Sequence, residues 1–235
     1  EQTPRARREI GASGSQILDG WLIDSEYNPD LQGKEALRVF DRMLRSDDAV
    51  QEAAGHITAP ILNAAWEVEP AGEELEDLEV AAAVEKAYFG GWLAPGWGWQ
   101  QHLDEALDHL FLGSYLFEIV WQVVEDELEI DDPSGEPDPA DPKGLKRRRT
   151  LERRQFLAPR RFDPRLPQTI LRWHEQDGEL SSVVQFALKE RDYGEFEIPA
   201  EQLLLFTHRR RGHEYTGRSL LRAASSFEQT AATSD

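Results

Sequence analysis

The apolar residues of this chain change their spacing along its length, and that change limits the folds that the chain can adopt. In the first half they recur every three or four residues, which is the period of an amphipathic helix. The clearest such run begins at Lys34 and contains Leu37, Phe40, Met43 and Leu44. A second helix is expected after it, with Ser46 or Asp47 placed to cap its start. Two further helices are predicted over residues 74–89 and 103–111.

Alternation of apolar and polar residues, the period of a strand, dominates the second half. A long strand is expected over residues 115–130 and a short one over residues 66–70. Four further strand-like runs occupy residues 150–156, 169–174, 183–189 and 203–207. The Asp177-Gly178 pair is a hairpin turn signal between two of these runs. Helices followed by strands are typical of an α+β fold, so we predict amphipathic helices with a mixed or antiparallel sheet.

The ends of the chain and one internal segment depart from this pattern. Residues 1–33 mix Gly, Asn and Pro with isolated apolar residues and are interpreted as an extended N-terminal arm. Residues 131–149 begin with four prolines among acidic residues. They are predicted to form an irregular charged loop inside a domain that spans residues 34–224. Residues 225–235 are interpreted as the start of a further region.

Composition excludes several classes of site. The 235 residues contain no Cys, which rules out disulfides, thiolate zinc sites, iron–sulfur clusters and Cys nucleophiles. Lys+Arg 26 against Asp+Glu 45 gives a net charge of −19, so the chain as a whole is poorly suited to neutralising nucleic-acid phosphates. No apolar run approaches the ~20 residues that a membrane-spanning helix needs. We therefore expect no membrane partner.

Charge is sharply segregated in the middle of the chain. Acidic residues are dense in residues 125–141, and residues 143–161 are rich in Lys and Arg. The two stretches could be complementary as antiparallel neighbours or across adjacent subunits, or both could be solvated. Two Arg runs are possible anion or subunit contacts, because guanidinium groups bind carboxylate and phosphate in a forked geometry. They are Arg147, Arg148 and Arg149, and Arg209, Arg210 and Arg211.

One constellation is compatible with metal binding. His102, Glu105 and His109 fall at i, i+3 and i+7 of a predicted helix and could share one face. A helix with so many acidic residues is more often a solvated face, and no other motif marks a catalytic group. We predict no catalytic residue, no metal site and no cofactor. A metal-dependent hydrolase that uses these three residues is one alternative, and a non-viral protein-interaction domain is another.

Four segments of the chain, taken in their order along the sequence, form a recognisable set of motifs. They are a helical segment at 40–50, a helix-to-strand passage at 60–70, a strand at 113–121 and a loop leading into a helix at 203–224. Together they resemble the Mu-type branch of the bacteriophage portal protein family. The signature positions that carry the resemblance are Met43, Leu44, Asp47, Val50, Trp66, Phe117, Glu118, Trp121, Gly217 and Ser219.

The resemblance implies a fold, a function and a set of partners. Residues 34–224 would be the N-terminal wing half of a portal protein, with Trp66, Phe117 and Trp121 buried in one core. The chain would be a non-enzymatic head–tail connector subunit in a ring, typically of twelve copies, at one capsid vertex. Double-stranded DNA would be packaged and ejected through the ring, with terminase, major capsid protein or scaffold, and a head–tail adaptor as partners. The protein would be assembled in the host cytoplasm and located in the virion.

Overall fold

The computed structural model describes residues 17–18, 21–22, 28–137, 147–189, 192–212 and 214–225. The predicted arm, residues 1–33, and the predicted further region, residues 225–235, lie mostly outside this part of the chain. Within it, helices precede most of the strands, and the strand pairs whose register is resolved are antiparallel. The predicted α+β fold is confirmed. None of the described helices is both long enough and apolar enough to cross a bilayer.

The chain divides into two compact units. Unit 1 comprises residues 1–62, 103–118 and 163–235, and unit 2 comprises residues 63–102 and 119–162. Helix α4 (Trp99–Leu107) and strands β3 (Ser114–Asp126) and β6 (Arg154–Arg165) each have residues in both units. The assignment of residues 34–224 as one wing domain stays a prediction.

Helices α1 (Gly33–Ser46) and α2 (Asp48–Leu62) of unit 1 follow the predicted pattern. The single helix predicted over 103–111 is instead broken at Asp108 into α4 and the short α5 (His109–Leu112). The Asp47 side chain accepts hydrogen bonds from the backbone N–H groups of Ala49 at 2.9 Å and Val50 at 3.2 Å, which confirms it as the cap of α2. The first core of unit 1 consists of Ala36, Phe40, Met43, Phe111 and Leu221.

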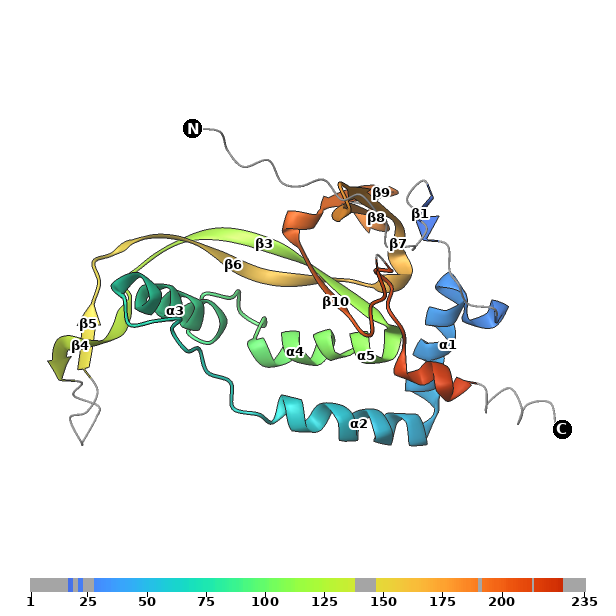
Figure 1. The fold of residues 1–235 in the computed structure, drawn as a ribbon, viewed down its shortest axis with the longest axis horizontal. Helices are drawn as coiled ribbons and strands as arrows, with labels where there is room; N and C mark the ends of the chain where they lie inside the picture. Colours follow the sequence, from blue (N-terminus) through green and yellow to red (C-terminus); the bar gives the residue numbers. More distant parts are fainter. Residues whose placement is uncertain are drawn as a thin grey trace. The chain divides into compact units, whose positions relative to one another are not determined.

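A three-stranded antiparallel sheet forms the second part of unit 1 (Figure 1). Its strands are β7 (Ile170–Gln176), β8 (Glu179–Lys189) and β9 (Asp192–Pro199). Asp177 and Gly178 have φ values of 54° and 84° between β7 and β8, so the predicted tight turn is confirmed. The second core of unit 1 consists of Leu116, Ile170, Trp173, Val183, Ile198 and Tyr215.

A second sheet has the strand order β10-β3-β6, with β10 (Leu203–Thr207) antiparallel to β3. In this register Leu205 lies opposite Leu116, and Phe206 lies opposite Tyr115. Four 3-10 turns join or end these elements. They are η1 (Pro29–Leu31), η2 (Pro167–Thr169), η3 (Ala200–Gln202) and η4 (Leu220–Ala223). A short hairpin of β1 (Ile17–Leu18) and β2 (Trp21–Leu22) lies near the start of the chain.

In unit 2, helix α3 (Leu75–Tyr88) packs on the strand residues that β3 and β6 contribute to this unit. Lys86 Nζ donates to Asp126 Oδ2 at 2.8 Å, and Trp92 Nε1 donates to the same oxygen at 2.9 Å. The hydrogen bonds from Lys86 and Trp92 lower the pKa of Asp126 to about 2. Gln122 Nε2 also donates to the Trp92 carbonyl, at 2.5 Å. Polar contacts therefore fasten the Trp-rich loop after α3 to the strands.

Aromatic rings fill the interior of unit 2. Trp99 lies 5.4 Å from Tyr88 and 5.7 Å from Trp66, measured between ring centroids. Tyr88 stacks on Phe162 at 5.7 Å, and His102 lies 4.5 Å from the same ring. Edge-to-face and stacked pairs of this kind stabilise a core beyond the area that they bury.

Three predictions, two about strands and one about the burial of aromatic signature residues, are wrong. Residues 65–70 form no strand, and the predicted strand over 115–130 is two strands, because β3 ends at Asp126. Phe117 is fully buried, but Trp66 and Trp121 are 46% and 45% exposed, so the three rings do not share one core. For β3, alternation indicated that a strand would form, but it did not show which of its faces another element covers.

The predicted irregular loop at 131–149 also needs correction. Its described residues belong to β4 (Glu129–Pro137) and β5 (Arg147–Thr150), which pair antiparallel. Ile130 lies opposite Arg149, and Asp131 lies opposite Arg148. An acidic strand therefore lies beside a basic strand of the same chain, which is the antiparallel arrangement that the charge segregation suggested.

Candidate functional site

The most constrained surface feature of unit 1 is the loop at residues 208–218, here called the arginine loop, which follows β10. Its first residue, His208, donates its backbone N–H to the Gly113 carbonyl at 2.8 Å. Its last residue, Arg218, donates its backbone N–H to the His208 carbonyl at 2.8 Å, and His208 Nδ1 lies 2.6 Å from the Arg218 carbonyl oxygen. The two ends of the loop are thus fastened to each other and to the turn between α5 and β3.

Two glycines make this close approach possible, and we call their contact the glycine junction. Gly113 has a φ of 94° and Gly217 a φ of 61°, both in the region that side chains disfavour. A Cβ on Gly217 would collide with the Gly113 carbonyl oxygen and lie 2.5 Å from the His208 oxygen. A Cβ on Gly113 would lie 2.6 Å from the Thr216 oxygen. Backbone therefore packs directly on backbone, and only glycine is compatible with either position.

Ser219 secures the junction on its other side. Its hydroxyl donates to the Phe111 carbonyl oxygen and accepts a hydrogen bond from the Leu221 backbone N–H at 2.9 Å. Ser219 is thus the cap of the 3-10 turn η4, which occupies residues 220–223 of the segment where the sequence predicts a helix. Two signature positions, Gly217 and Ser219, therefore build the support of the arginine loop.

The arginine loop presents guanidinium groups on a rigid aromatic base. The Arg210 guanidinium carbon lies 4.5 Å from the centroid of Tyr215, and its Nε donates to the Gly212 carbonyl at 3.0 Å. Tyr215 is buried and stacks on Trp173 at 5.3 Å between centroids. The Tyr215 hydroxyl donates to Glu175 at 2.7 Å, and burial together with this carboxylate raises the pKa of Tyr215 to about 12.

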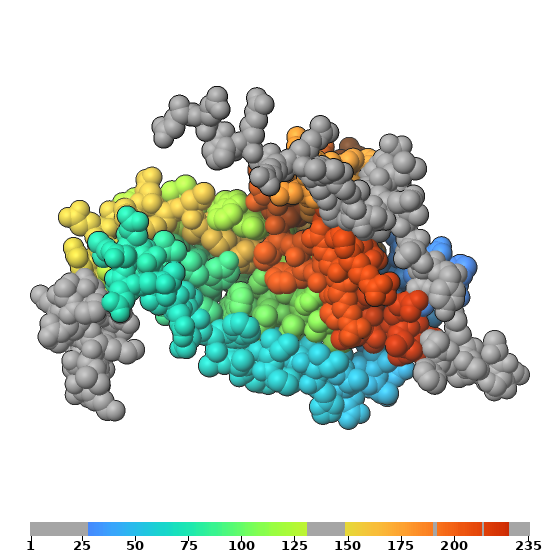
Figure 2. All heavy atoms as spheres, in the orientation of Figure 1, coloured from blue at the N-terminus to red at the C-terminus, as the bar shows by residue number. Residues whose placement is uncertain are grey.

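Arg209, Arg210 and Arg211 are all exposed. Residues of this segment lie on the exposed face of the molecule seen in Figure 2. Exposed guanidinium groups are suited to carboxylate or phosphate partners, because their planar fork binds both groups in a bidentate geometry. In the other predicted Arg run, Arg149 is exposed on β5, whereas the side chains of Arg147 and Arg148 lie outside the described part of the chain.

The remaining signature residues have structural positions. Met43 is buried in the first core, and Leu44 and Val50 pack against that core. Glu118 forms a partly buried ion pair with Arg165, which includes a 3.0 Å hydrogen bond from Arg165 Nε. These residues hold elements of unit 1 together, and a contact role for the Arg residues stays a prediction.

Sequence reasoning missed a cavity of about 320 Å³ in unit 1. Among its lining residues we call the buried Phe40, Ile170 and Trp173 the floor, and the more exposed cations Lys34, Arg218 and Arg222 the rim. These residues come from α1, β7 and the segment 218–222 at the end of the arginine loop, which are far apart in sequence. The sequence gives little indication of this cavity, because Lys34, Arg218 and Arg222 each look like an ordinary surface residue.

The metal constellation is not assembled. Helix α4 ends at Leu107, so His109 belongs to the next helix, where its Nδ1 lies 2.7 Å from the Ala106 carbonyl oxygen. His102 is only 7% exposed, and burial lowers its pKa to about 4. No group of three or more His, Asp or Glu side chains among the described residues is placed to hold a metal ion. No observation on these residues favours the metal-dependent hydrolase.

The chain was compared with known protein families. The model of the family described as the portal protein of Mu bacteriophage matches residues 37–227. This range includes all ten signature positions, the glycine junction and the arginine loop. Portal proteins of this family are structural components of the phage capsid. The chain therefore belongs to the Mu-type bacteriophage portal protein family.

Proposed function

We propose that this chain is a subunit of a closed portal ring, typically of twelve copies, through which double-stranded DNA is packaged and ejected. The observation that carries the proposal is the family match over residues 37–227. Terminase, major capsid protein or scaffold, and a head–tail adaptor are the partners that such a ring would meet. The ring would assemble in the host cytoplasm and stand at one vertex of the capsid.

The charge of the chain is compatible with this role. A net charge of −19 disfavours tight binding of phosphate, because such binding depends on neutralisation by Lys and Arg. A channel that moves DNA works better when its wall holds the DNA weakly, since strong phosphate contacts would stall translocation. A local group of guanidinium side chains such as the arginine loop would supply a weak, salt-sensitive contact with DNA or with a neighbouring subunit.

Assembly is the direct test. Mass photometry of the protein at several concentrations should resolve a species of roughly ten or more subunits, as expected for a closed ring with heterologous interfaces. Negative-stain images of that species should contain rings with a central opening. A distribution restricted to monomers and dimers at every concentration would contradict the proposal.

The role of the arginine loop is tested separately. Replacing Arg209, Arg210 and Arg211 with Gln removes the charge while keeping side-chain length. We expect weaker binding of double-stranded DNA to the ring, or weaker assembly, in low-salt buffer. The same three changes at Arg147, Arg148 and Arg149 form the matched comparison. A loop variant that assembles and binds DNA as the unmodified chain does would leave this loop without a contact role.

A further inference from the structure

We infer that the apolar cavity of unit 1 receives the acidic start of helix α3 from a second copy of this chain. The inference rests on the proposed ring, because it names two surfaces through which neighbouring subunits would meet. Its tests therefore distinguish failure of this contact from failure of ring assembly.

The receiving surface combines an apolar floor with a cationic rim. Phe40 and Trp173 line the interior of the 320 Å³ cavity, a volume at the lower end of the ~300–1,000 Å³ typical of binding pockets. The rim carries Lys34, Arg218 and Arg222, together with one carboxylate, that of Glu214. Among the residues that the structure describes, neither Lys34 nor Arg218 has a carboxylate partner for its side chain.

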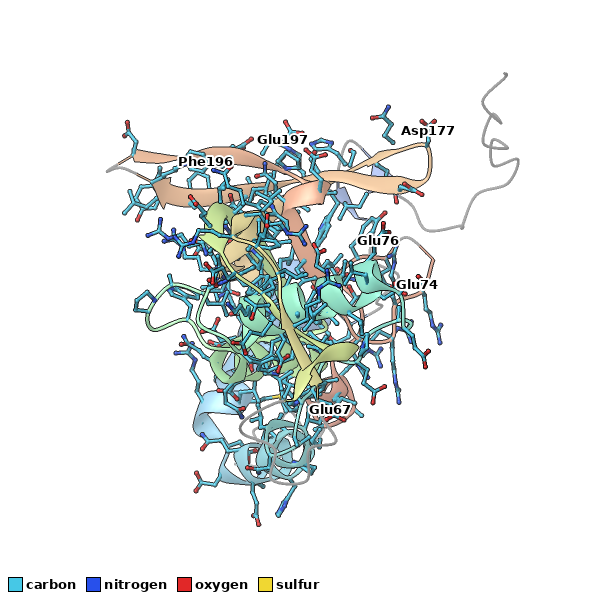
Figure 3. The ribbon with its side chains drawn as sticks, turned by 90° about the vertical axis from the view of Figure 1, so that its left-hand side faces the viewer. Glu67, Glu74, Glu76, Asp177, Phe196 and Glu197 are labelled. Carbon is cyan, nitrogen blue, oxygen red and sulfur yellow. The ribbon has the colours of Figure 1, made fainter. Side chains whose placement is uncertain are left out.

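The inserted surface is the start of α3 in unit 2. Leu75, its first residue, is 42% exposed although apolar. Glu73, Glu74 and Glu76 flank it and are also exposed, and Figure 3 shows the labelled Glu74 and Glu76 at the surface of this segment. Glu74 occupies the cap position without making a side-chain cap hydrogen bond. Within the described part of the chain, no ion pair or side-chain hydrogen bond engages these three carboxylates.

The two surfaces are complementary in chemistry. The carboxylates around Leu75 would meet Lys34 and Arg218 beside the apolar cavity, so that Leu75 enters the floor and the acids reach the rim. Recognition by an apolar anchor in a groove is a common mode for helices, and opposite charges around the anchor set its orientation. By contrast, the acidic strand β4 already has the basic strand β5 beside it in the same chain.

The contact would be heterologous, because each copy offers one cavity and one α3 start, and the two surfaces differ. Heterologous contacts propagate head to tail and form a ring where the rotation closes. A contact between like surfaces would instead stop at a dimer. The direction of subunit addition in the ring follows from this asymmetry.

The absence of Cys from the chain allows a clean crosslinking test. In the double variant Lys34→Cys/Glu74→Cys, a short bis-maleimide reagent should join neighbouring copies and produce a ladder of covalent multimers on a denaturing gel. The matched control is Lys34→Cys/Glu52→Cys, since Glu52 is exposed on α2, and it should give no ladder. Mixing the two single-Cys variants, Lys34→Cys and Glu74→Cys, should stop at covalent dimers.

Charge reversal gives an independent readout. Lys34→Glu and Glu74→Lys should each lower the assembled fraction about tenfold at low salt, and the double variant should recover most of it. Glu52→Lys should leave assembly unchanged. Rings that form without the ladder and without these charge effects would overturn the inference while the portal proposal stands. A chain that never assembles beyond a dimer would overturn both.

Discussion

Unit 1 and unit 2 differ in how completely they bury their apolar side chains. Unit 1 contains two clusters of buried residues, one around Met43 and one around Trp173. Unit 2 packs its aromatic rings on one side of its strands but leaves Trp121 and Val123, two residues apart on β3, 45% and 66% exposed. Unit 1 also exposes some large apolar side chains, Phe186, Leu188 and Tyr193 among them, but it is the larger unit and contains both buried clusters. The comparison indicates that buried clusters stabilise unit 1, whereas unit 2 leaves more of its large apolar side chains exposed for its size.

The largest effect is expected at the glycine junction of unit 1. Gly217→Val should destabilise the protein by about 4 kcal/mol or more, because its side chain would collide with two carbonyl oxygens at a positive φ. Urea denaturation followed by Trp fluorescence would measure the loss. Gly55→Ala is the matched control, since its Cβ meets open space in α2, and it should stabilise the helix by about 0.5–1 kcal/mol. Equal stability of the two variants would mean that the junction is not formed.

Two residues of β3 test the difference between the units, because Phe117 lies in the interior of unit 1 and Trp121 is partly exposed in unit 2. Phe117→Ala should cost about 3–5 kcal/mol, because its ring is fully buried. Trp121→Ala should cost less, about 1–2 kcal/mol of folding free energy, because this residue is nearly half exposed. The same denaturation assay reports both values. If Trp121→Ala unfolds an isolated subunit as readily as Phe117→Ala does, the two units do not differ in the way described.

A smaller effect is expected from His102, which is buried in unit 2. Burial lowers its pKa from 6.5 to about 4, so its neutral form stabilises the fold above pH 6.5 and that stability is lost as the pH falls through about 4. A difference of this size amounts to about 3 kcal/mol. His102→Gln should flatten the loss of stability between pH 6.5 and 4. Retention of the full acid sensitivity in this variant would assign the titration to another group.

The smallest effect is expected from Asp108 in unit 1, and its sign is opposite. Burial, followed by the charges of Asp104, Glu105 and Asp41, raises the pKa of Asp108 to about 6. Its stabilising protonated form is complete below pH 3.8 and is lost as the pH rises through about 6. Asp108→Asn should therefore stabilise the protein at pH 7 by about 1 kcal/mol, after allowance for solvent screening. An NMR titration that places this carboxyl near its ordinary pKa of 3.8 would contradict the prediction.

Local patterns in the sequence predicted the parts of the fold that local physics determines. Helix α1 follows from apolar residues at one period, the start of α2 follows from the capping side chain of Asp47, and the β7–β8 turn follows from Asp177-Gly178. Each depends on residues within a few positions of one another. For that reason a single sequence was sufficient to predict these three features.

Features that depend on distant partners were missed. The proline-rich acidic segment reads as a loop by itself, and it becomes β4 only because residues 147–150 pair with it. Trp66 and Trp121 look like core aromatics, but their exposure depends on which faces other elements cover. The cavity likewise exists only where α1, β7 and the segment 218–222 at the end of the arginine loop meet.

Because the arginine loop is held by its ends, substitutions in its exposed part can change which partner it binds without changing the fold. Its ends are held by backbone groups of Gly113, His208 and Arg218, and its Tyr215 is held in the second core, so neither support depends on the exposed side chains at residues 209–211. A loop held in this way tolerates exchange of these exposed residues, as surface loops commonly do. Relatives could thus carry acidic, aromatic or basic versions of the loop on one scaffold. Partner choice would then evolve by substitution within a short segment, without renewed selection for folding.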